Sequence, residues 1–387
     1  MYHIECSDKF SSKLDIKNFF YRVNQLNVAG KKKIIYIKDV FEITTFRYRT
    51  YNVMEALENS TKYIVTCFMV EELRVISKLI DKIDLVILQR CKWSIELESF
   101  LNLAKTIGIK IVFDMDDLIY NNKYIPDYLY NIGDYTDSCI SSLVAMVNLY
   151  RMSIDFCDEF IVSTPKLALQ MEKDFKKKTY IYHNFLNFEQ EEISKKICSL
   201  KEKKYDNSKF VIGYFSGSGT HARDLDVALD SILKLMNKYD DVYFEIVGFM
   251  ALNNKFDKYI KNKRLIMKPL VTYQELQYLI GSVDLNIIPL QKNLFNDCKS
   301  ELKFFEAAIV NTLTLASSNA VYGKVIEDGV NGFLVDDFDW FDKLEYIYLN
   351  RNKLKKIVDN ARIYSLDEYG CSTQREGLSS MFDEILS

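Results

Sequence analysis

The segment KFVIGYFSGSGTHARD (residues 209–224) joins an apolar run to a loop of small residues, and a helical pattern follows it near Leu225. Residues 210–215 are apolar, β-branched and aromatic, and the run has the length of a buried strand. The small residues after it tolerate positive φ and let a ligand approach the backbone closely: Gly217, Ser218, Gly219 and Thr220. The segment therefore predicts a strand, a loop and a helix of an α/β domain.

The loop of this segment has the features of an anion site. Where a helix follows a strand, free N–H groups and the positive end of the helix dipole point the same way, and Arg223 adds a fork of donors. The glycines at 213, 217 and 219 do not have the G-x-G-x-x-G spacing, and no Gly-Lys-Ser/Thr follows as in a P-loop. An ordinary turn between a strand and a helix is the alternative interpretation.

The alternation of strands and helices recurs on both sides of this segment. Further strands are predicted at 34–37, 64–68, 84–88, 110–113, 159–163, 179–183, 242–247, 264–267, 284–289 and 312–316. Such alternation predicts parallel sheets covered by helices. We therefore predict an α/β protein with two Rossmann-like, doubly wound domains that face each other across a cleft, with ligands at the carboxyl ends of the strands.

A change of composition suggests the domain boundaries. Residues 187–208 are rich in Glu, Lys and Ser, which predicts a linker with one solvated helix. The N-terminal domain is then expected at 1–186 and the C-terminal domain at 209–370. Residues 371–387 are expected to form a helix that packs back on the N-terminal domain.

Composition excludes several classes of protein. The 387 residues are 48% hydrophobic, enough for two cores, and the net charge of −3 argues against nucleic acid as the main partner. Eight scattered cysteines without a C-x-x-C pair predict a reduced, cytoplasmic protein with no structural zinc. The first residues lack the apolar region of a signal peptide, and no apolar run approaches the roughly 18–20 residues of a spanning helix.

A second anion site is predicted in the segment NDCKSELKFFEAA. On a helix expected at 299–310, Lys299, Lys303 and Glu306 share one face near the N-terminus. Two lysines there suit a bound anion, because the helix dipole alone disfavours cations at that end. Glu306 would accept hydrogen bonds from ligand hydroxyls. A solvated face of lysine and glutamate is the alternative.

The half of the chain from Ile212 to Val335 resembles the nucleotide-binding domain of GT-B glycosyltransferases, in particular the large retaining family four. The matching segments are IGYFSGSGTHARD, DLNIIPL, KSELKFFEAA and VIEDGVNGFLVDD, the last being the most specific. FDMDDLIY and TTFRYRTYN resemble a bacterial subgroup that assembles surface polysaccharides and includes rhamnosyltransferases. The resemblance implies a nucleotide-diphosphate sugar as donor, a glycan or lipid-linked acceptor, retention at the anomeric carbon, and no cofactor or metal.

The resemblance also implies roles for single residues. Glu306 matches the second of two family glutamates, which contacts the nucleotide ribose, whereas the first would stand at Cys298. The diphosphate would be held by Arg223 with the two lysines. A histidine of the N-terminal domain of the family is replaced here by Asp116. The 209–370 domain would thus bind the nucleotide sugar, and the 1–186 domain the acceptor.

Strand ends of the N-terminal half supply further candidates. Two close carboxylates repel each other, so one of them has a raised pKa and can act as a donor or base. The candidate catalytic residues are therefore Asp116 and Asp117, together with Arg223 and Lys303 of the C-terminal half. Donor-binding candidates, besides the loop and the helix face above, are Arg47, Arg49 and His183, although a lone histidine at a strand end is more often structural.

Two other functions remain open from the sequence. Asp114 and Asp116 spell the Asp-x-Asp motif of metal-dependent GT-A transferases, whose metal bridges a diphosphate. The missing glutamate at position 298 also fits a catalytically silent GT-B subunit that binds a partner or glycan. Lysine clusters at 173–178 and 195–204 are interpreted as solvated faces, with contact to the inner face of an anionic membrane as the alternative.

Overall fold

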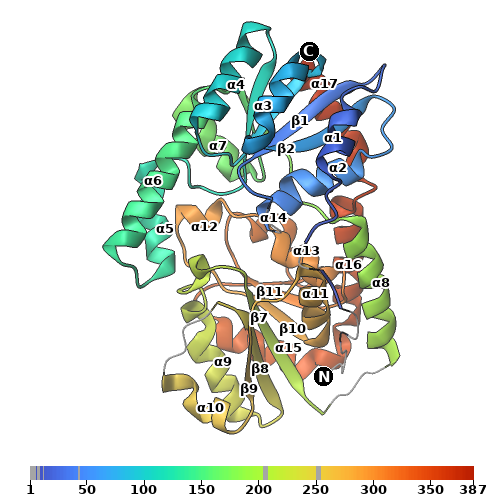
Figure 1. The fold of residues 1–387 in the computed structure, drawn as a ribbon. Coiled ribbons are helices and arrows are strands. Elements are labelled where there is room, and N and C mark those ends of the chain that lie inside the picture. Colours follow the sequence, from blue (N-terminus) through green and yellow to red (C-terminus); the bar gives the residue numbers. More distant parts are fainter. Residues whose placement is uncertain (1–5, 7–8, 12, 42–43, 204–207, 250–253) are drawn as a thin grey trace.

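The computed structural model describes residues 6, 9–11, 13–41, 44–203, 208–249 and 254–387. These residues form two α/β units, one above the other in Figure 1, each built around a six-stranded sheet. All pairings between the named strands are parallel. The two Rossmann-like, doubly wound domains predicted from the sequence are thus confirmed.

The N-terminal sheet has the strand order β2-β1-β3-β4-β5-β6. Chain order reverses between β1 and β3, which makes this point the topological switch of the sheet. The strands are β1 (Lys32–Lys38), β2 (Tyr63–Met69), β3 (Leu85–Gln89), β4 (Lys110–Met115), β5 (Glu159–Val162) and β6 (Thr179–Ile181).

The C-terminal sheet has the order β12-β11-β10-β7-β8-β9, with its switch point between β7 and β10. Every residue of β7 and β10 is buried, as in strands covered by helices on both faces. The strands are β7 (Phe210–Ser216), β8 (Val242–Gly248), β9 (Leu265–Lys268), β10 (Leu285–Ile288), β11 (Leu313–Ser317) and β12 (Phe333–Val335). Only β12, three residues long, was not predicted from the sequence.

Helices and single helical turns cover the faces of both sheets. Those before β7 are α1 (Phe19–Gln25), η1 (Arg47–Tyr51), α2 (Asn52–Ala56), η2 (Val70–Glu72), α3 (Leu73–Ile76), η3 (Ser77–Lys82), α4 (Ile95–Thr106), η4 (Asn122–Tyr124), α5 (Ile125–Ile132), α6 (Asp137–Ile154), α7 (Pro165–Phe175) and α8 (Phe188–Lys203). Those after it are η5 (Gly219–His221), α9 (Asp226–Lys238), η6 (Asn254–Phe256), α10 (Asp257–Lys261), α11 (Tyr273–Ser282), α12 (Leu294–Asp297), α13 (Leu302–Ala308), α14 (Tyr322–Val325), α15 (Trp340–Asn350), η7 (Arg351–Lys353), α16 (Lys355–Tyr369) and α17 (Gln374–Leu386).

The segment predicted to be a polar linker is largely the helix α8. One face of α8 is buried, including Gln190, Ile193, Ile197 and Lys201, so the prediction of a solvated helix is wrong for that face. The buried Lys201 ammonium donates to two carbonyls, at 2.7 Å and 3.1 Å, and to Thr312 Oγ1 at 2.9 Å. These bonds satisfy a charge that composition alone would place in water.

The C-terminal helix α17 returns to the N-terminal sheet. In Figure 1 this red helix lies beside the blue strands β1 and β2. Its Asp383 accepts from Tyr63 and pairs with Lys62, and Glu384 pairs with Lys178 at 2.7 Å. A single buried cluster also joins strand β1 to Phe185, α8, α11 and α13, so apolar packing connects the two units. The connections through Phe185 and through α17 are both packed, and near the N-terminus the Phe10 ring lies 6.2 Å from the Tyr278 ring of α11.

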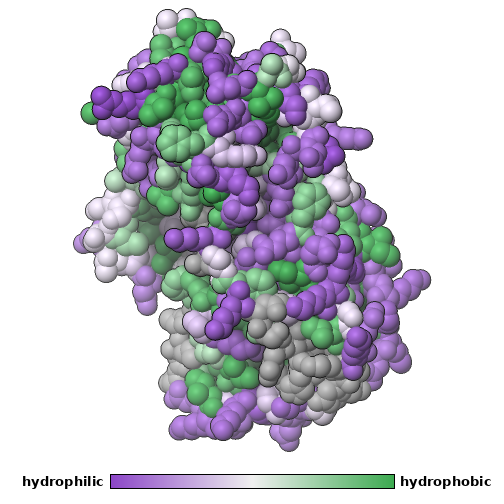
Figure 2. Space-filling view, turned by 45° about the vertical axis from the view of Figure 1, so that its right-hand side comes forward, coloured by the Kyte–Doolittle hydropathy of each residue, from purple (hydrophilic) through white to green (hydrophobic). Residues whose placement is uncertain are grey.

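The molecular surface is mainly hydrophilic. The face shown in Figure 2 carries its hydrophobic side chains in small groups separated by hydrophilic ones. Within the described part of the chain, no helix combines the length and apolar character needed to cross a membrane.

Gly248 marks the closest backbone approach at the candidate site. Its φ is +103°, and a Cβ there would stand 1.9 Å from the carbonyl oxygen of Ser216, the last residue of β7. Gly248→Ala should therefore lower the unfolding free energy by at least about 2 kcal/mol, because it adds both backbone strain and a clash. Urea unfolding followed by circular dichroism measures this change.

The matched control is Gly217→Ala, one residue after Ser216. A Cβ at Gly217 would meet nothing within 4 Å, so its unfolding free energy should stay within about 0.5 kcal/mol of wild type. Equal stability of the two variants would contradict the strained approach of β8 to the end of β7.

Candidate functional site

The two switch points place their loops opposite each other between the domains. In doubly wound sheets ligands bind in the crevice at such points, outside the carboxyl ends of the strands. The segment after β1 meets the C-terminal domain, since Arg47 Nη2 lies 3.6 Å from Glu306 Oε1. After β5, Thr164 Oγ1 donates to the Cys298 carbonyl at 3.0 Å. The candidate site is therefore the interdomain region around the ends of β1, β4, β7 and β10.

A buried carboxylate, Asp224, organises the C-terminal half of the site. Its Oδ1 accepts from the Gln291 backbone N–H at 3.0 Å and from Asn296 Nδ2 at 2.8 Å. Its Oδ2 lies 2.8 Å from His221 Nδ1 and 3.6 Å from Lys299 Nζ. Asp224 thus ties the loop after β7 to the loop after β10, across the switch point of the sheet.

These contacts fix the protonation states of His221 and Asp224. Burial, and then the charges of Lys299 and Lys303, lower the pKa of His221 to about 3, so the imidazole is neutral. Burial alone would raise the pKa of Asp224, but the bond from His221 and the charge of Lys299 outweigh it and hold this pKa at about 2. The site therefore contains one fixed negative charge next to two lysines.

The two lysines stand close together in an environment that disfavours their charge. Burial lowers the pKa of Lys299, and burial together with the charge of Lys299 lowers the pKa of Lys303 to about 8. Asp224, whose Oδ2 lies 3.6 Å from Lys299 Nζ, already accepts three other hydrogen bonds. An anion bound here would stabilise the charged form of both lysines.

Helix α13 begins at Leu302, three residues later than predicted. The predicted helix 299–310 is wrong at this end because α12 and a turn through Cys298 precede it. Lys299 therefore lies in that turn rather than on the helix face. The turn nevertheless brings Lys299 to Asp224, and Lys303 in the first turn of α13 lies over the Tyr214 ring at 5.5 Å.

The small-residue loop lies beside the lysines, and its conformation differs in one respect from the prediction. Neither Gly217 nor Gly219 has positive φ, so glycine is not required there for backbone conformation. In front of both α-carbons there is open space where a Cβ would stand. The loop therefore keeps its backbone accessible, as predicted, while the Thr220 side chain lies outside the described set.

The N-terminal domain presents Asp116 and Asp117 to this cluster. Arg90 Nη1 lies 3.2 Å from Asp116 Oδ1 and 3.6 Å from Asp117 Oδ2. Burial and the charge of Asp116 raise the pKa of Asp117 to about 6, against the opposing charges of Arg90 and Lys299. Because Lys299 contributes to this pKa, the predicted acidic and basic residues of the two domains lie near each other.

Arg49 and Asp114 form a buried ion pair instead of an open binding site. Arg49 Nε and Nη2 donate to both oxygens of Asp114, at 2.8 and 2.9 Å, and Nη1 donates to the Tyr182 carbonyl at 2.5 Å. With Asp114 engaged by Arg49 and Asp116 by Arg90, these carboxylates do not offer the open oxygens that a divalent cation requires. The metal-dependent GT-A alternative therefore fits neither this donor set nor the two-sheet fold.

Glu306 is held by the N-terminal domain through Arg47 and Tyr48, which we call the Arg47–Tyr48 latch. Tyr48 donates its hydroxyl proton to Glu306 Oε1, and Arg47 Nη2 lies 3.6 Å from the same oxygen. The Arg47 guanidinium lies between the rings of Tyr48 and Tyr273, 4.0 and 4.3 Å from their centroids. Arg47, Tyr48 and Glu306 are all buried, so a hydroxyl ligand reaches Glu306 only after the latch moves.

Two further candidates lie apart from the lysine cluster. The Arg223 guanidinium lies over the Tyr130 ring at 5.0 Å, and its backbone N–H donates to the Asn131 carbonyl at 3.2 Å. Arg223 thus contacts helix α5 of the other domain. The His183 ring nitrogen Nδ1 lies 2.7 Å from Glu301 Oε1, at a separate cavity.

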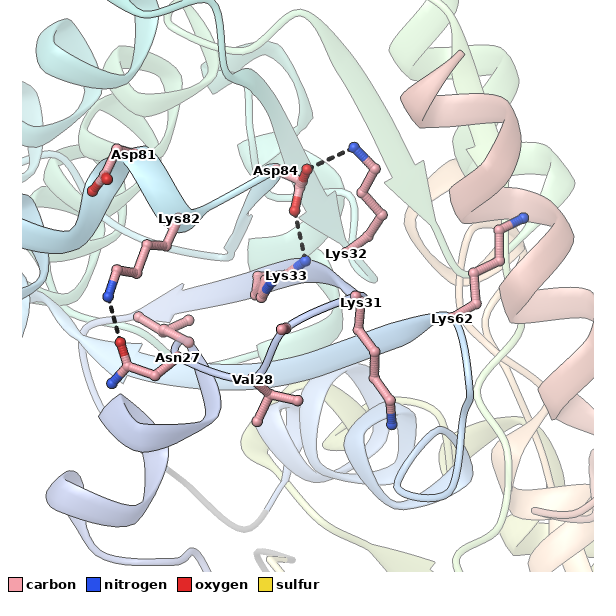
Figure 3. A pocket seen from close by; sticks show the side chains of 12 residues that line it. Asn27, Val28, Lys31, Lys32, Lys33, Lys62, Asp81, Lys82 and Asp84 are labelled. Carbon is pink, nitrogen blue, oxygen red and sulfur yellow. Dashed lines mark hydrogen bonds and ion pairs between the residues drawn. The ribbon is translucent and has the colours of Figure 1, made fainter.

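Another hollow, of about 530 Å³, lies at the opposite end of the N-terminal sheet, and Figure 3 shows its lysines. Asp84 accepts from Lys32 Nζ and from the Lys33 backbone, each at 2.8 Å, and Lys82 donates to Asn27. This hollow adjoins the amino ends of the strands, whereas ligands of such sheets bind at the carboxyl ends. We therefore place the functional site between the domains.

Sequence reasoning did not assign several residues of the site. They are Tyr48, Arg90, His221, Asn296 and Glu301. His221, Asn296 and Glu301 stand inside the two segments already singled out, and Tyr48 inside TTFRYRTYN, so their positions were available from the sequence. Their partners, and the place of Arg90, depend on contacts between distant loops, for which one sequence contains no signal.

Comparison with known proteins shows similarity only at the level of structure. No family model matches the chain, and no curated protein matches it. The structure of Anabaena HepE in complex with UDP is 13% identical, with a TM-score of 0.58, over 91% of this chain and all of that chain. A glycosyltransferase from Rickettsia africae is 14% identical, with a TM-score of 0.60, over 92% of this chain and 99% of its own.

Sucrose-phosphate synthase from Thermosynechococcus elongatus gives the same TM-score of 0.60 at 10% identity, over 92% of this chain and 99% of its own. At such low identity the likeness concerns the fold alone. The chain therefore has the GT-B fold of glycosyltransferases, two Rossmann-like domains with the candidate site between them.

Proposed function

We propose that this protein is a glycosyltransferase that moves a sugar from a nucleotide-diphosphate sugar to a hydroxyl group of a glycan or a lipid-linked acceptor. The observation that carries the proposal is the pair Lys299 and Lys303, buried at the switch point beside an open backbone loop. Burial lowers the pKa of both ammonium groups, and a bound anion would stabilise their charged forms. A diphosphate has the charge and the acceptor oxygens to fill this role.

In this proposal the diphosphate group fixes the position of the donor in the site. Its oxygens would accept from Lys299, Lys303 and the backbone N–H groups around Gly217 and Gly219, with neutral His221 at the edge. Glu306 would accept from the ribose hydroxyls after the Arg47–Tyr48 latch has moved. The structures of HepE with UDP and with UDP-glucose support uridine nucleotides as the first donors to test.

The chemical step breaks the bond between the anomeric carbon and the diphosphate oxygen. The electron pair leaves with the diphosphate, and the acceptor oxygen forms the new bond to the anomeric carbon. With retention by front-face attack, the acceptor proton passes to the departing phosphate oxygen. The two lysines stabilise the charge that grows on this oxygen, which makes electrostatic preorganisation the main catalytic contribution.

The acidic residues of the N-terminal domain would orient the reacting sugar. Asp116 and Asp117 approach the lysines from the other side of the cleft, and burial with like-charge repulsion keeps the pKa of Asp117 near 6. Such carboxyls suit hydrogen bonds to sugar hydroxyls. Arg223 would keep α5 in place through Tyr130.

Turnover with a panel of nucleotide sugars tests this function. We expect release of nucleotide diphosphate from at least one donor, at the same rate with and without EDTA, because the carboxylates of the site are engaged by arginines. The measurement is a coupled assay of diphosphate release, started with UDP-glucose and extended to GDP- and dTDP-sugars. Binding of a nucleotide without release would favour the silent subunit, and release only with a divalent metal would favour the metal-dependent alternative.

Lys303 gives the site a defined pH dependence. Its pKa near 8 in the free protein rises when a diphosphate binds, so binding favours the protonated ammonium. The affinity for UDP should therefore be constant between pH 7 and about 7.5 and fall above pH 8, by at most about tenfold per pH unit. Calorimetric titration of UDP between pH 7 and 9.5 measures this decline.

Lys303→Arg is the matched variant, because a guanidinium keeps its charge over this range. Its affinity for UDP should fall less than that of wild type between pH 8 and 9, and uridine, which lacks the diphosphate, should show no decline over this range with either protein. A decline of equal size in wild type and Lys303→Arg would show that Lys303 does not contact the diphosphate.

A further inference from the structure

A cavity of about 400 Å³ lies between the domains, next to the lysine cluster but not part of it. Its N-terminal wall is formed by the first residues of α7 and the segment after β6, and its C-terminal wall by Glu301, α14 and the end of α16. This volume is within the range of small-molecule sites. The residues that line it are Thr164, Pro165, Lys166, Ile181, Tyr182, His183, Glu301, Ala320, Val321, Lys324, Val325, Tyr364, Glu368, Tyr369 and Gln374.

A carboxylate from one domain and an imidazole from the other meet in this cavity. Glu301 is 1% exposed, and its Oε1 lies 2.7 Å from Nδ1 of His183, whose side chain is 45% exposed. A buried carboxylate is costly unless several donors satisfy it. Because His183 and Glu301 belong to different domains, the pair exists only while the domains are closed.

The other walls combine aromatic faces with hydroxyl and amide groups. The Tyr369 ring lies edge-on to His183 at 6.5 Å and to Tyr364 at 6.2 Å. The Tyr182 hydroxyl donates to Gln374 Oε1 at 2.9 Å, which fixes both side chains. Aromatic surface with hydrogen-bonding groups at its edge matches a sugar ring, which has apolar C–H faces and hydroxyls around its rim.

The charges of the cavity distinguish it from the diphosphate site. Two acids, Glu301 and Glu368, stand against two lysines, Lys166 and Lys324, so the lining has no surplus charge apart from His183. The diphosphate site, by contrast, places two buried lysines next to each other, with Asp224 and Asp117 nearby. The cavity therefore suits a neutral ligand better than a phosphate.

The cavity is also close enough to take part in transfer. Glu301 stands two residues from Lys299 and two from Lys303, so its α-carbon is within about 7.6 Å of both of theirs. The carboxylate faces the cavity, whereas Lys299 faces Asp224 on the other side of the turn. A ligand in the cavity and a diphosphate on the lysines would thus share the turn between Lys299 and Lys303.

We propose that this cavity is the acceptor site and that it binds a neutral saccharide, with a sugar hydroxyl on the cavity side of the His183–Glu301 contact. The inference rests on the proposed function, and it replaces the expected role of His183 in donor binding by a role in acceptor binding. Because both domains contribute, the acceptor is held only in the closed molecule, after the donor has bound. His183 and Glu301 position the attacking hydroxyl next to the departing diphosphate.

Ligand-observed NMR with free monosaccharides, in the presence of saturating UDP, tests this inference without the natural acceptor. Glucose, galactose, mannose, rhamnose and N-acetylglucosamine form the panel. We expect at least one to bind wild-type protein, and Glu301→Gln to weaken that binding about tenfold or more, because a charged hydrogen bond becomes a neutral one. Tyr369→Phe, which keeps the ring and removes the hydroxyl, is a second variant should Glu301→Gln fold poorly.

Glu376→Gln is the control, since Glu376 is exposed on α17 and does not line the cavity. It should leave saccharide binding unchanged, and calorimetry should give the same UDP affinity for all variants. With UDP binding intact, any of three results would overturn the acceptor site. These are no saccharide binding to wild type, unchanged saccharide binding in both cavity variants, or displacement of the saccharide by uridine. Loss of UDP binding in the wild type itself would instead remove the proposed function.

Discussion

The geometry of the site depends on one buried carboxylate, Asp224. It holds the loop after β7 to the loop after β10 through four neighbouring donors, and so fixes the two sides of the switch point relative to each other. A carboxylate with no solvent exposure persists only when its oxygens are satisfied. Burial lowers the pKa of Lys299, and the nearby charge of Asp224 opposes this by stabilising the ammonium form. A similar buried carboxylate occurs in the N-terminal domain. There Asp114, in β4, binds Arg49 and so joins the segment after β1 to the end of β4.

Contacts between the domains fill the position proposed for the ribose with the protein's own side chains. Tyr48 and Arg47 satisfy the Glu306 carboxylate, which burial would otherwise tend to protonate, since burial raises its pKa. A nucleotide that displaces this latch would replace the hydrogen bonds of Tyr48 and Arg47 with its own. Glu306 would therefore keep hydrogen-bond partners when the nucleotide binds. The same exchange would release η1 from Glu306, so that η1 could move when the ligand binds. Donor binding and the position of the N-terminal domain would thereby be coupled.

The sequence predicted the architecture well because it depends on local patterns. Eleven of the strands were located from short apolar runs, and the two doubly wound domains followed from their alternation with helices. The site was predicted less completely, because side-chain partners depend on loops that meet only in the folded chain. Arg49 and Arg223 were expected at the donor, yet the first is bound to Asp114 and the second lies on Tyr130. The start of α13 was misplaced because the turn after α12 has no proline or glycine to mark it.

The central claim is that Lys299 and Lys303 bind the diphosphate of a sugar nucleotide at the switch point of the C-terminal sheet. A crystal structure of the protein with UDP tests it most directly. Our account predicts the diphosphate on both ammonium groups and on the backbone around Gly217 and Gly219, the ribose on Glu306, and Tyr48 moved away from that carboxylate. A nucleotide bound elsewhere, with Tyr48 and Arg47 still on Glu306, would contradict it.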